Sequence, residues 1–193
     1  MNPEMTFMSQ LSEDETIVLK AINVLRKATP VDVARKLGDP YTPQDMTQYL
    51  RSLEGRNLVN KIQENPLTYE VSPLGLIAIG ALSKDAKEVF VSVPSEKCFF
   101  FYTGTGPDKF TKLSACNLSD LRDKAKVVDV KSLEFHVPRG DIEKWLKDVL
   151  GDSELAKEIE RIRPLKLQGE ALRARILRLI NSRIEKLTRK PQF

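Results

Sequence analysis

The chain has 193 residues, of which 41% are hydrophobic and 30% are charged, and its formal net charge is +4. This length fits two small domains, and the apolar content is too high for a disordered chain. No apolar run approaches the roughly 18 residues of a membrane span, and Met1–Gln10 lacks the layout of a signal peptide, so we expect a cytoplasmic protein without a membrane partner.

The residues that usually carry catalysis and metal binding are scarce. There is one histidine, His136, and the chain contains no nucleophile-elbow, phosphate-loop or zinc-protease motif. We therefore expect a non-enzymatic protein with no cofactor and no metal. Cys98 and Cys116 are too few for a disulfide framework or a four-ligand zinc site, and we expect them to be buried free thiols that pack as small apolar residues.

Charge is distributed unevenly along the chain. Residues 1–85 carry 9 Lys and Arg against 11 Asp and Glu, whereas residues 86–193 carry 22 against 16. The basic excess gathers in Arg161–Phe193, where 10 basic residues face only Glu170 and Glu185. Such a run attracts polyanions, but a basic helix face is also often simply solvated, and both interpretations stay open.

Three polar caps, each followed by apolar residues at helical spacing, predict three helices in the first half. Ser12 and Glu15 form a capping box, and proline follows Thr29 and Thr42 at the first helical position. The predicted helices end near Arg26, Gly38 and Gly55.

A hairpin and a fourth helix follow. Residues 58–62 and 68–71 flank a turn-rich loop and predict two paired strands. Ser72 and Pro73 open a very apolar helix that we expect to continue through Leu82. Helix, short helix, helix, hairpin, helix is the order of a winged helix-turn-helix domain.

Two strings resemble those of MarR-like and PadR-like regulators. LRSLEGRNLV (residues 50–59) resembles the end of a recognition helix running into the wing, and YEVSPLG (residues 69–75) resembles the junction between the last wing strand and the next helix. The resemblance covers about 75 residues and implies that the third helix enters the major groove of DNA while the wing follows the backbone.

Mapped onto this sequence, the expected DNA contacts lie on the outer face of the third helix and at the base of the wing. They are Gln44, Thr47, Gln48, Arg51, Ser52, Arg56 and Lys61. Gln and Thr read base edges, and the guanidinium of Arg51 can pair with guanine. The domain is net negative, however, and phosphate contacts usually supply most of the affinity, so a protein partner is the alternative.

The second half begins with a polar stretch, Lys84–Lys87, that we expect to link two domains. Residues 89–93 and 98–102 predict two strands joined by a turn. Residues 133–137 alternate as a strand does, but the segment is short enough for a helical turn.

The remaining patterns predict helices. They begin at Asn117 or Ser119, at Gly140 or Asp141, and at Asp152 or Ser153, and a final helix has about 20 residues. Its apolar stripe fits packing on its own domain, or across a homodimer, better than a free coiled coil. The other faces carry further expected nucleic-acid contacts, namely Arg173, Arg175, Arg178, Arg183 and Lys186.

A second resemblance concerns this half. FFYTG (residues 100–104), SLEFH (residues 132–136) and RGDIEKWLKDVLGD (residues 139–152) resemble an uncharacterised domain found in archaea and some thermophilic bacteria. The resemblance implies a folded domain and transfers no function. His136, Arg139, Asp141 and Trp145 form the one cluster that suggests an anion or nucleotide site, against the simpler interpretation of a buried histidine, an interface tryptophan and a helix cap.

Together these patterns predict the α+β class, mostly helical, in two domains. A winged helix-turn-helix domain occupies residues 10–83, and a mainly helical domain with a small sheet and a basic terminal helix occupies residues 84–193. We expect a DNA-binding transcriptional regulator. The alternatives are an RNA- or ribosome-associated factor, a protein adaptor in a replication or transcription complex, and an enzyme centred on His136.

Overall fold

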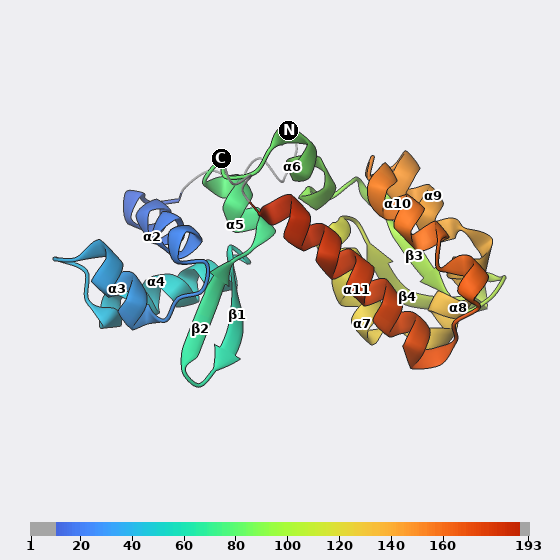
Figure 1. Cartoon of the computed structure of the whole chain (residues 1–193), viewed down its shortest axis with the longest axis horizontal. Helices are drawn as coiled ribbons and strands as arrows, with labels where there is room; N and C mark the ends of the chain where they lie inside the picture. Colours follow the sequence, from blue (N-terminus) through green and yellow to red (C-terminus); the bar gives the residue numbers. More distant parts are fainter. Residues whose placement is uncertain (1–10, 190–193) are drawn as a thin grey trace. The chain divides into compact units, whose positions relative to one another are not determined.

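The computed structural model describes residues 11–189, apart from the side chains of residues 84 and 85. The predicted domain start at residue 10, the segment Met1–Gln10 and the last four residues of the basic run lie outside it. The fold is α+β and mostly helical, with two separate two-stranded sheets (Figure 1). The chain divides into two compact units, Met1–Leu82 and Ser83–Phe193.

Three capped helices open the first unit, as the sequence predicts. They are α2 (Glu13–Leu25), α3 (Pro30–Leu37) and α4 (Pro43–Gly55). Each begins with a complete capping box. The side chain of Ser12, Thr29 or Thr42 accepts the backbone N–H of the residue three positions later, and the carboxylate of that residue accepts the backbone N–H of the cap residue. Because these bonds form between residues three apart, the sequence alone contains the signal.

The predicted hairpin is present as β1 (Val59–Glu64) and β2 (Leu67–Val71), which pair antiparallel. The link between α2 and α3 joins this pair, since Ala28 and Tyr69 exchange two backbone hydrogen bonds. The core of the unit lies between the helices and the hairpin and is built from side chains including Leu19, Ile22, Met46, Leu50 and Tyr69.

Helix α5 (Pro73–Ala78) starts at the predicted Ser72 cap but ends before the predicted Leu82. Gly80 has a φ of 65°, and its N–H bonds back to the carbonyl of Ile77, so the chain turns out of the helix there. Gly75 lies so close to the Leu58 carbonyl that a Cβ would approach its oxygen to 2.1 Å. Glycine therefore lets α5 pack against the start of the hairpin.

The second unit differs from the predicted strands in two places. Residues 89–93 are not a strand: α6 spans Lys84–Phe90, so the predicted Lys84–Lys87 linker is helical as well. Ser83 caps this helix, and the side chains of Ala86, Val89 and Phe90 are buried at helical spacing. Three β-prone residues in a row gave a misleading strand signal because tertiary burial overrides propensity.

The predicted strand at residues 98–102 is β3 (Phe99–Tyr102), but its partner is β4 (Phe110–Ala115), which the sequence analysis missed. A bulge interrupts this pair, and Lys112 in it has a φ of 63°. The bulge breaks the alternation that identifies a strand.

Cys98 and Cys116 form a disulfide, so the expectation of free thiols is wrong. The register pairs Phe99 with Ala115, which places the two cysteines opposite each other one position further along. Their Cα atoms are 4.3 Å apart. Without β4 the sequence could not show this proximity.

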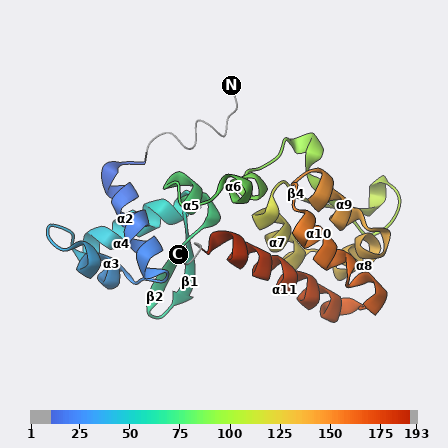
Figure 2. The same cartoon turned by 45° about the horizontal axis from the view of Figure 1, so that its top comes forward.

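The helices that follow include one where the sequence left two possibilities open. Residues 133–137 are helical, because Leu133, His136 and Val137 of α8 are buried at helical spacing. The set comprises α7 (Leu118–Val127), α8 (Val130–Arg139), α9 (Asp141–Asp148), α10 (Ser153–Glu160) and α11 (Gly169–Thr188), which begin after Asn117, Asp129, Gly140, Asp152 and Gln168. Helix α11 packs against α7, α8 and α10 (Figure 2).

Candidate nucleic-acid interface

The outer face of α4 carries one row of polar side chains. Met46, Leu50 and Leu53 point into the core and are fully buried. Gln44, Gln48 and Arg51 lie on the opposite side, are exposed, and their side chains form no hydrogen bond or ion pair with any other described residue. The spacing of four and three places them along one side of the helix. We call these three residues the α4 row.

The other predicted contacts of this unit are already engaged. The Thr47 hydroxyl donates to the carbonyl of Pro43, the Ser52 hydroxyl donates to Glu15, and the guanidinium of Arg56 pairs with Glu15 at 2.9 Å. Lys61 pairs with Glu64 at 2.8 Å, but both side chains are at least one-third exposed and such a pair opens readily. The α4 row is thus the part of the predicted set that is free.

Glu15 connects the first turn of α2 to α4. It accepts the Ser12 N–H as part of the capping box and also bonds Ser52 and Arg56. Burial raises the pKa of Glu15, but the hydrogen bonds from the Ser12 backbone, Arg56 and Ser52 outweigh burial and hold the pKa below its ordinary value. Glu15 is therefore a negative charge that fixes the position of α4.

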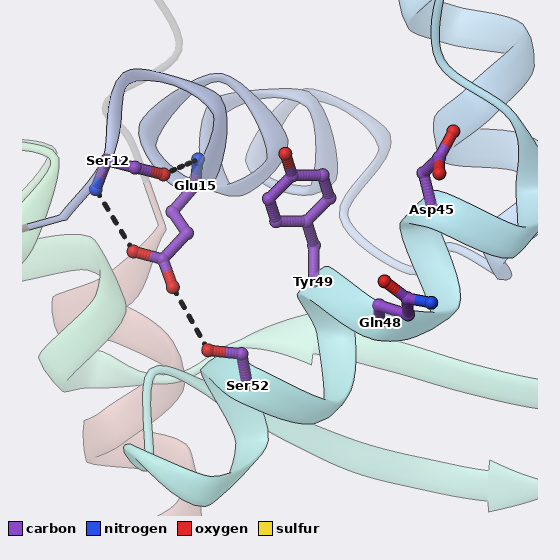
Figure 3. A pocket seen from close by; sticks show the side chains of 6 residues that line it. All are labelled: Ser12, Glu15, Asp45, Gln48, Tyr49 and Ser52. Atoms are coloured by element: carbon purple, nitrogen blue, oxygen red, sulfur yellow. Dashed lines mark hydrogen bonds between the residues drawn. The ribbon is translucent and has the colours of Figure 1, made fainter.

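A shallow pocket of about 460 Å³ lies beside this connection (Figure 3). Its lining comes from the start of α2 and the length of α4 and consists of Ser12, Glu15, Asp45, Gln48, Tyr49 and Ser52. Next to it, Asp14 accepts hydrogen bonds from the hydroxyls of Tyr41 and Tyr49, which lower the pKa of Asp14. The pocket side of the α4 row is consequently acidic.

The sequence analysis missed this second role of Glu15 and the two tyrosines. The capping box identified Glu15 only as a partner of Ser12. The hydroxyls of Tyr41 and Tyr49 reach Asp14 at 2.7 Å and 2.9 Å. Nothing in the local pattern indicates these bonds, because they join residues 27 to 41 positions apart.

Three of the five predicted contacts on α11 have partners within the second unit. Arg173 bonds Glu170 and donates to the Ala125 carbonyl. Arg183 pairs with the fully buried carboxylate of Asp152 and with Glu154, and Lys186 also pairs with Glu154. Arg173 and Arg183 are therefore largely buried in these contacts, whereas the Lys186–Glu154 pair is exposed and opens readily.

Two cations of that set have no such partner among the described residues. Arg178 is exposed, and the Nε atom of Arg175 is buried without a hydrogen-bond partner in the described part of the chain. They leave α11 with far less free positive charge than its sequence suggests.

The cluster around His136 is a hydrogen-bonded network within the second unit. His136 is buried, its Nε2 accepts the Tyr102 N–H at 2.9 Å, and its Nδ1 therefore carries the proton that it shares with Asp141 at 2.8 Å. Burial lowers the pKa of His136, although Asp141 raises it. Both ring nitrogens are occupied, so the ring has no lone pair available as a general base.

The neighbouring cluster residues also have contacts within the unit. Arg139 bonds Asp141 and lies 4.8 Å above the centre of the Phe135 ring. Trp145 is buried against Phe99 and its indole N–H donates to the carbonyl of Lys97. Across residues 11–189, no three His, Cys, Asp or Glu side chains are grouped as a metal site would need. No helix in that part of the chain is long and apolar enough to span a membrane.

Comparison of the chain with protein families, with curated proteins and with solved structures finds no match in any of the three.

Proposed function

We propose that this chain is a cytoplasmic, non-enzymatic DNA-binding regulator whose first unit acts as a winged helix and inserts α4 into the major groove. The observation that carries the proposal is the α4 row. Three exposed side chains of the types that read bases lie along one side of a helix, and none has a partner among the described residues.

The surrounding elements support the same proposal. Helices α3 and α4 are joined by a short turn, the hairpin follows α4 directly, and the Ala28–Tyr69 pairing adds the α2–α3 link to the hairpin. An α-helix is about 10 to 12 Å across with its side chains and fits a major groove about 12 Å wide, and the 13 residues of α4 give it a length of about 20 Å. Arg51 would pair with guanine, and Gln44 and Gln48 would contact adenine or the backbone.

The test begins with selection from a random duplex library by the full chain, followed by fluorescence anisotropy on the selected site. Gln48→Ala with Arg51→Ala should weaken binding by about tenfold or more, since a good base contact contributes about 1 to 3 kcal/mol. Arg51→Lys keeps the charge but removes the two-pronged geometry, so it should relax the base preference while preserving most non-specific binding.

The matched control is Lys20→Ala, because Lys20 is an exposed cation on α2 that bonds no other described residue. This control should leave the selected-site preference unchanged. Failure to enrich any sequence, or equal binding by the α4 variants and the wild type, would reject the proposal.

A protein-adaptor role is the second candidate, and the acidic pocket favours it. Glu15 and Asp45 line that pocket beside Gln48, and Asp14 lies next to it, so a basic segment of a partner would meet complementary charge. Asp45→Asn removes the charge but keeps an oxygen that can accept the Thr42 N–H in the cap of α4. It should weaken such a complex, whereas removing an acidic group beside the groove should strengthen DNA binding. The sign of this one change distinguishes the two functions.

A further inference from the structure

The outer face of the β3–β4 pair carries three aromatic rings in a row. Phe99 and Phe101 point inward and are buried, whereas Phe100 is 40% exposed and Tyr102 is half-buried on the other side of the strand. Phe110 of β4 lies between these two, with ring centres 5.9 Å from Phe100 and 5.3 Å from Tyr102. We call Phe100, Tyr102 and Phe110 the aromatic row.

Of the three rings, Phe100 is exposed, whereas Tyr102 and Phe110 are half-buried. The solvent face of an antiparallel pair is usually polar, and a contiguous exposed apolar surface usually marks an interaction site. Of the four successive aromatic residues of β3, Phe99 and Phe101 are therefore part of the core, and Phe100 and Tyr102 face outward. His136, which fixes the Tyr102 backbone, and the Cys98–Cys116 disulfide at the far end hold the strand that presents the row.

The charge around the row is positive. Lys97, Lys109 and Lys112 adjoin the three rings along the chain, and all three are exposed. Lys109 pairs with Asp108 at 2.8 Å, but both side chains are exposed and such a pair opens readily. Glu96 and Asp108 oppose them, which leaves the segment with one net positive charge, and the unit from Ser83 to Phe193 carries 23 Lys and Arg against 17 Asp and Glu. A ligand that has both flat rings and negative charges would complement the aromatic rings and the lysines.

We infer that the aromatic row is a binding site for single-stranded nucleic acid, in which unpaired bases stack on Phe100 and Tyr102 while the lysines contact phosphates. Alternate residues of a strand are spaced about 6.6 to 6.8 Å apart, a distance that suits successive splayed bases. Stacking on aromatic rings is tolerant of base identity, so binding is expected to show little sequence preference. A duplex hides its base faces and is excluded from the row.

The inference is independent of the α4 row and has its own test. The full chain is titrated, by fluorescence anisotropy, into uridine and thymidine oligonucleotides of about 12 nucleotides, a size that spans one such site. An abasic strand of the same length provides the phosphates without the bases. Binding of the two base-bearing strands should be about tenfold or more tighter than binding of the abasic strand.

Two matched pairs of variants separate stacking from charge. Phe100→Thr keeps a strand-forming residue but removes the ring, and it should weaken binding by about tenfold; Val127→Thr, at a side chain 71% exposed on the same unit, should not. Lys112→Gln should reduce the salt dependence of binding, whereas Lys147→Gln, another exposed lysine, should not. Melting by circular dichroism verifies that each variant is folded.

Crosslinking provides a readout that a purely structural role would not affect. An oligonucleotide with 5-iodouridine should crosslink to residues of the aromatic row, identified by mass spectrometry of the peptides. Equal affinity for abasic and base-bearing strands, or crosslinks only elsewhere, would overturn the inference. So would a dimer that Phe100→Thr converts to a monomer without any oligonucleotide binding, because the row would then be covered by a second copy of the chain.

Discussion

His136 is bonded through both ring nitrogens, to the Tyr102 N–H and to Asp141. We expect His136→Ala to lower the free energy of unfolding by about 1 to 3 kcal/mol, because the half-buried Tyr102 N–H loses its acceptor and the ring leaves a cavity beside Phe99. His136→Gln should recover part of the loss, since its side-chain oxygen can accept that N–H. Thermal melts of the three proteins test this, and a wild-type-like melt of His136→Ala would contradict it.

His136 also makes the stability of the fold depend on pH. Burial, opposed by Asp141, gives His136 a pKa below its ordinary 6.5, so the unfolded chain takes up a proton at a higher pH than the folded chain does. This part of the stability is complete above about pH 6.5 and is lost as the pH falls from there toward the folded-state pKa. Melting temperatures between neutral and mildly acidic pH should fall less for His136→Gln than for the wild type. Parallel curves would refute the assignment.

At the scale of elements, Arg183 fastens α11 to the start of α10. Its partner Asp152 has a fully buried side chain that also caps α10. Arg183→Ala should cost about 3 kcal/mol, because the charge of Asp152 would remain buried without its ion pair. Arg178→Ala, on the exposed side of the same helix, should change stability by less than about 0.5 kcal/mol. Chemical denaturation of both variants compares them, and similar losses would show that the pair is unimportant.

The Cys98–Cys116 disulfide also joins two elements, because it links the chain at one end of the β3–β4 pair. Its cysteines are 18 positions apart, and a loop of this size corresponds to a stabilisation of about 3 kcal/mol. Replacing both cysteines with alanine and treating the wild type with a reducing agent should lower the melting temperature to a similar extent. The reducing agent should not affect the double variant. A reductant-insensitive wild type would show that the bond contributes little.

At the scale of the whole molecule, the two proposed sites lie on different units, one on α4 and one on β3–β4. We expect Gln48→Ala with Arg51→Ala to reduce binding of the selected duplex but not of single strands, and Phe100→Thr to do the reverse. The combined variant should show both losses, with additive free energies, because the sites share no residue. A strong departure from additivity in the titrations would indicate that the two sites act on a common ligand.

The sequence anticipated the first unit better than the second. The capping boxes of α2, α3 and α4 are patterns of four residues, and the hairpin follows from a turn between two short strands, so local chemistry determines both. In the second unit, residues 89 and 90 have strand-forming side chains but are buried in helix α6. The bulge in β4 interrupts the alternation that would have identified it as a strand. The sequence could not separate the three residues of the α4 row from Thr47, Ser52 and Arg56, which are also polar and whose partners are seen only in the structure.

By itself, the sequence determined the mostly helical α+β class, the beginnings of most helices and the length of α11, because caps and apolar spacing act within a few residues. Only the tertiary structure decided which polar groups are free. The Arg56–Glu15 and Arg183–Asp152 pairs and the Cys98–Cys116 bond join positions 18 to 41 residues apart. Such contacts depend on strand register and helix packing, which no local pattern specifies. For the same reason, the three rings of the aromatic row form one surface only when β4 is paired with β3.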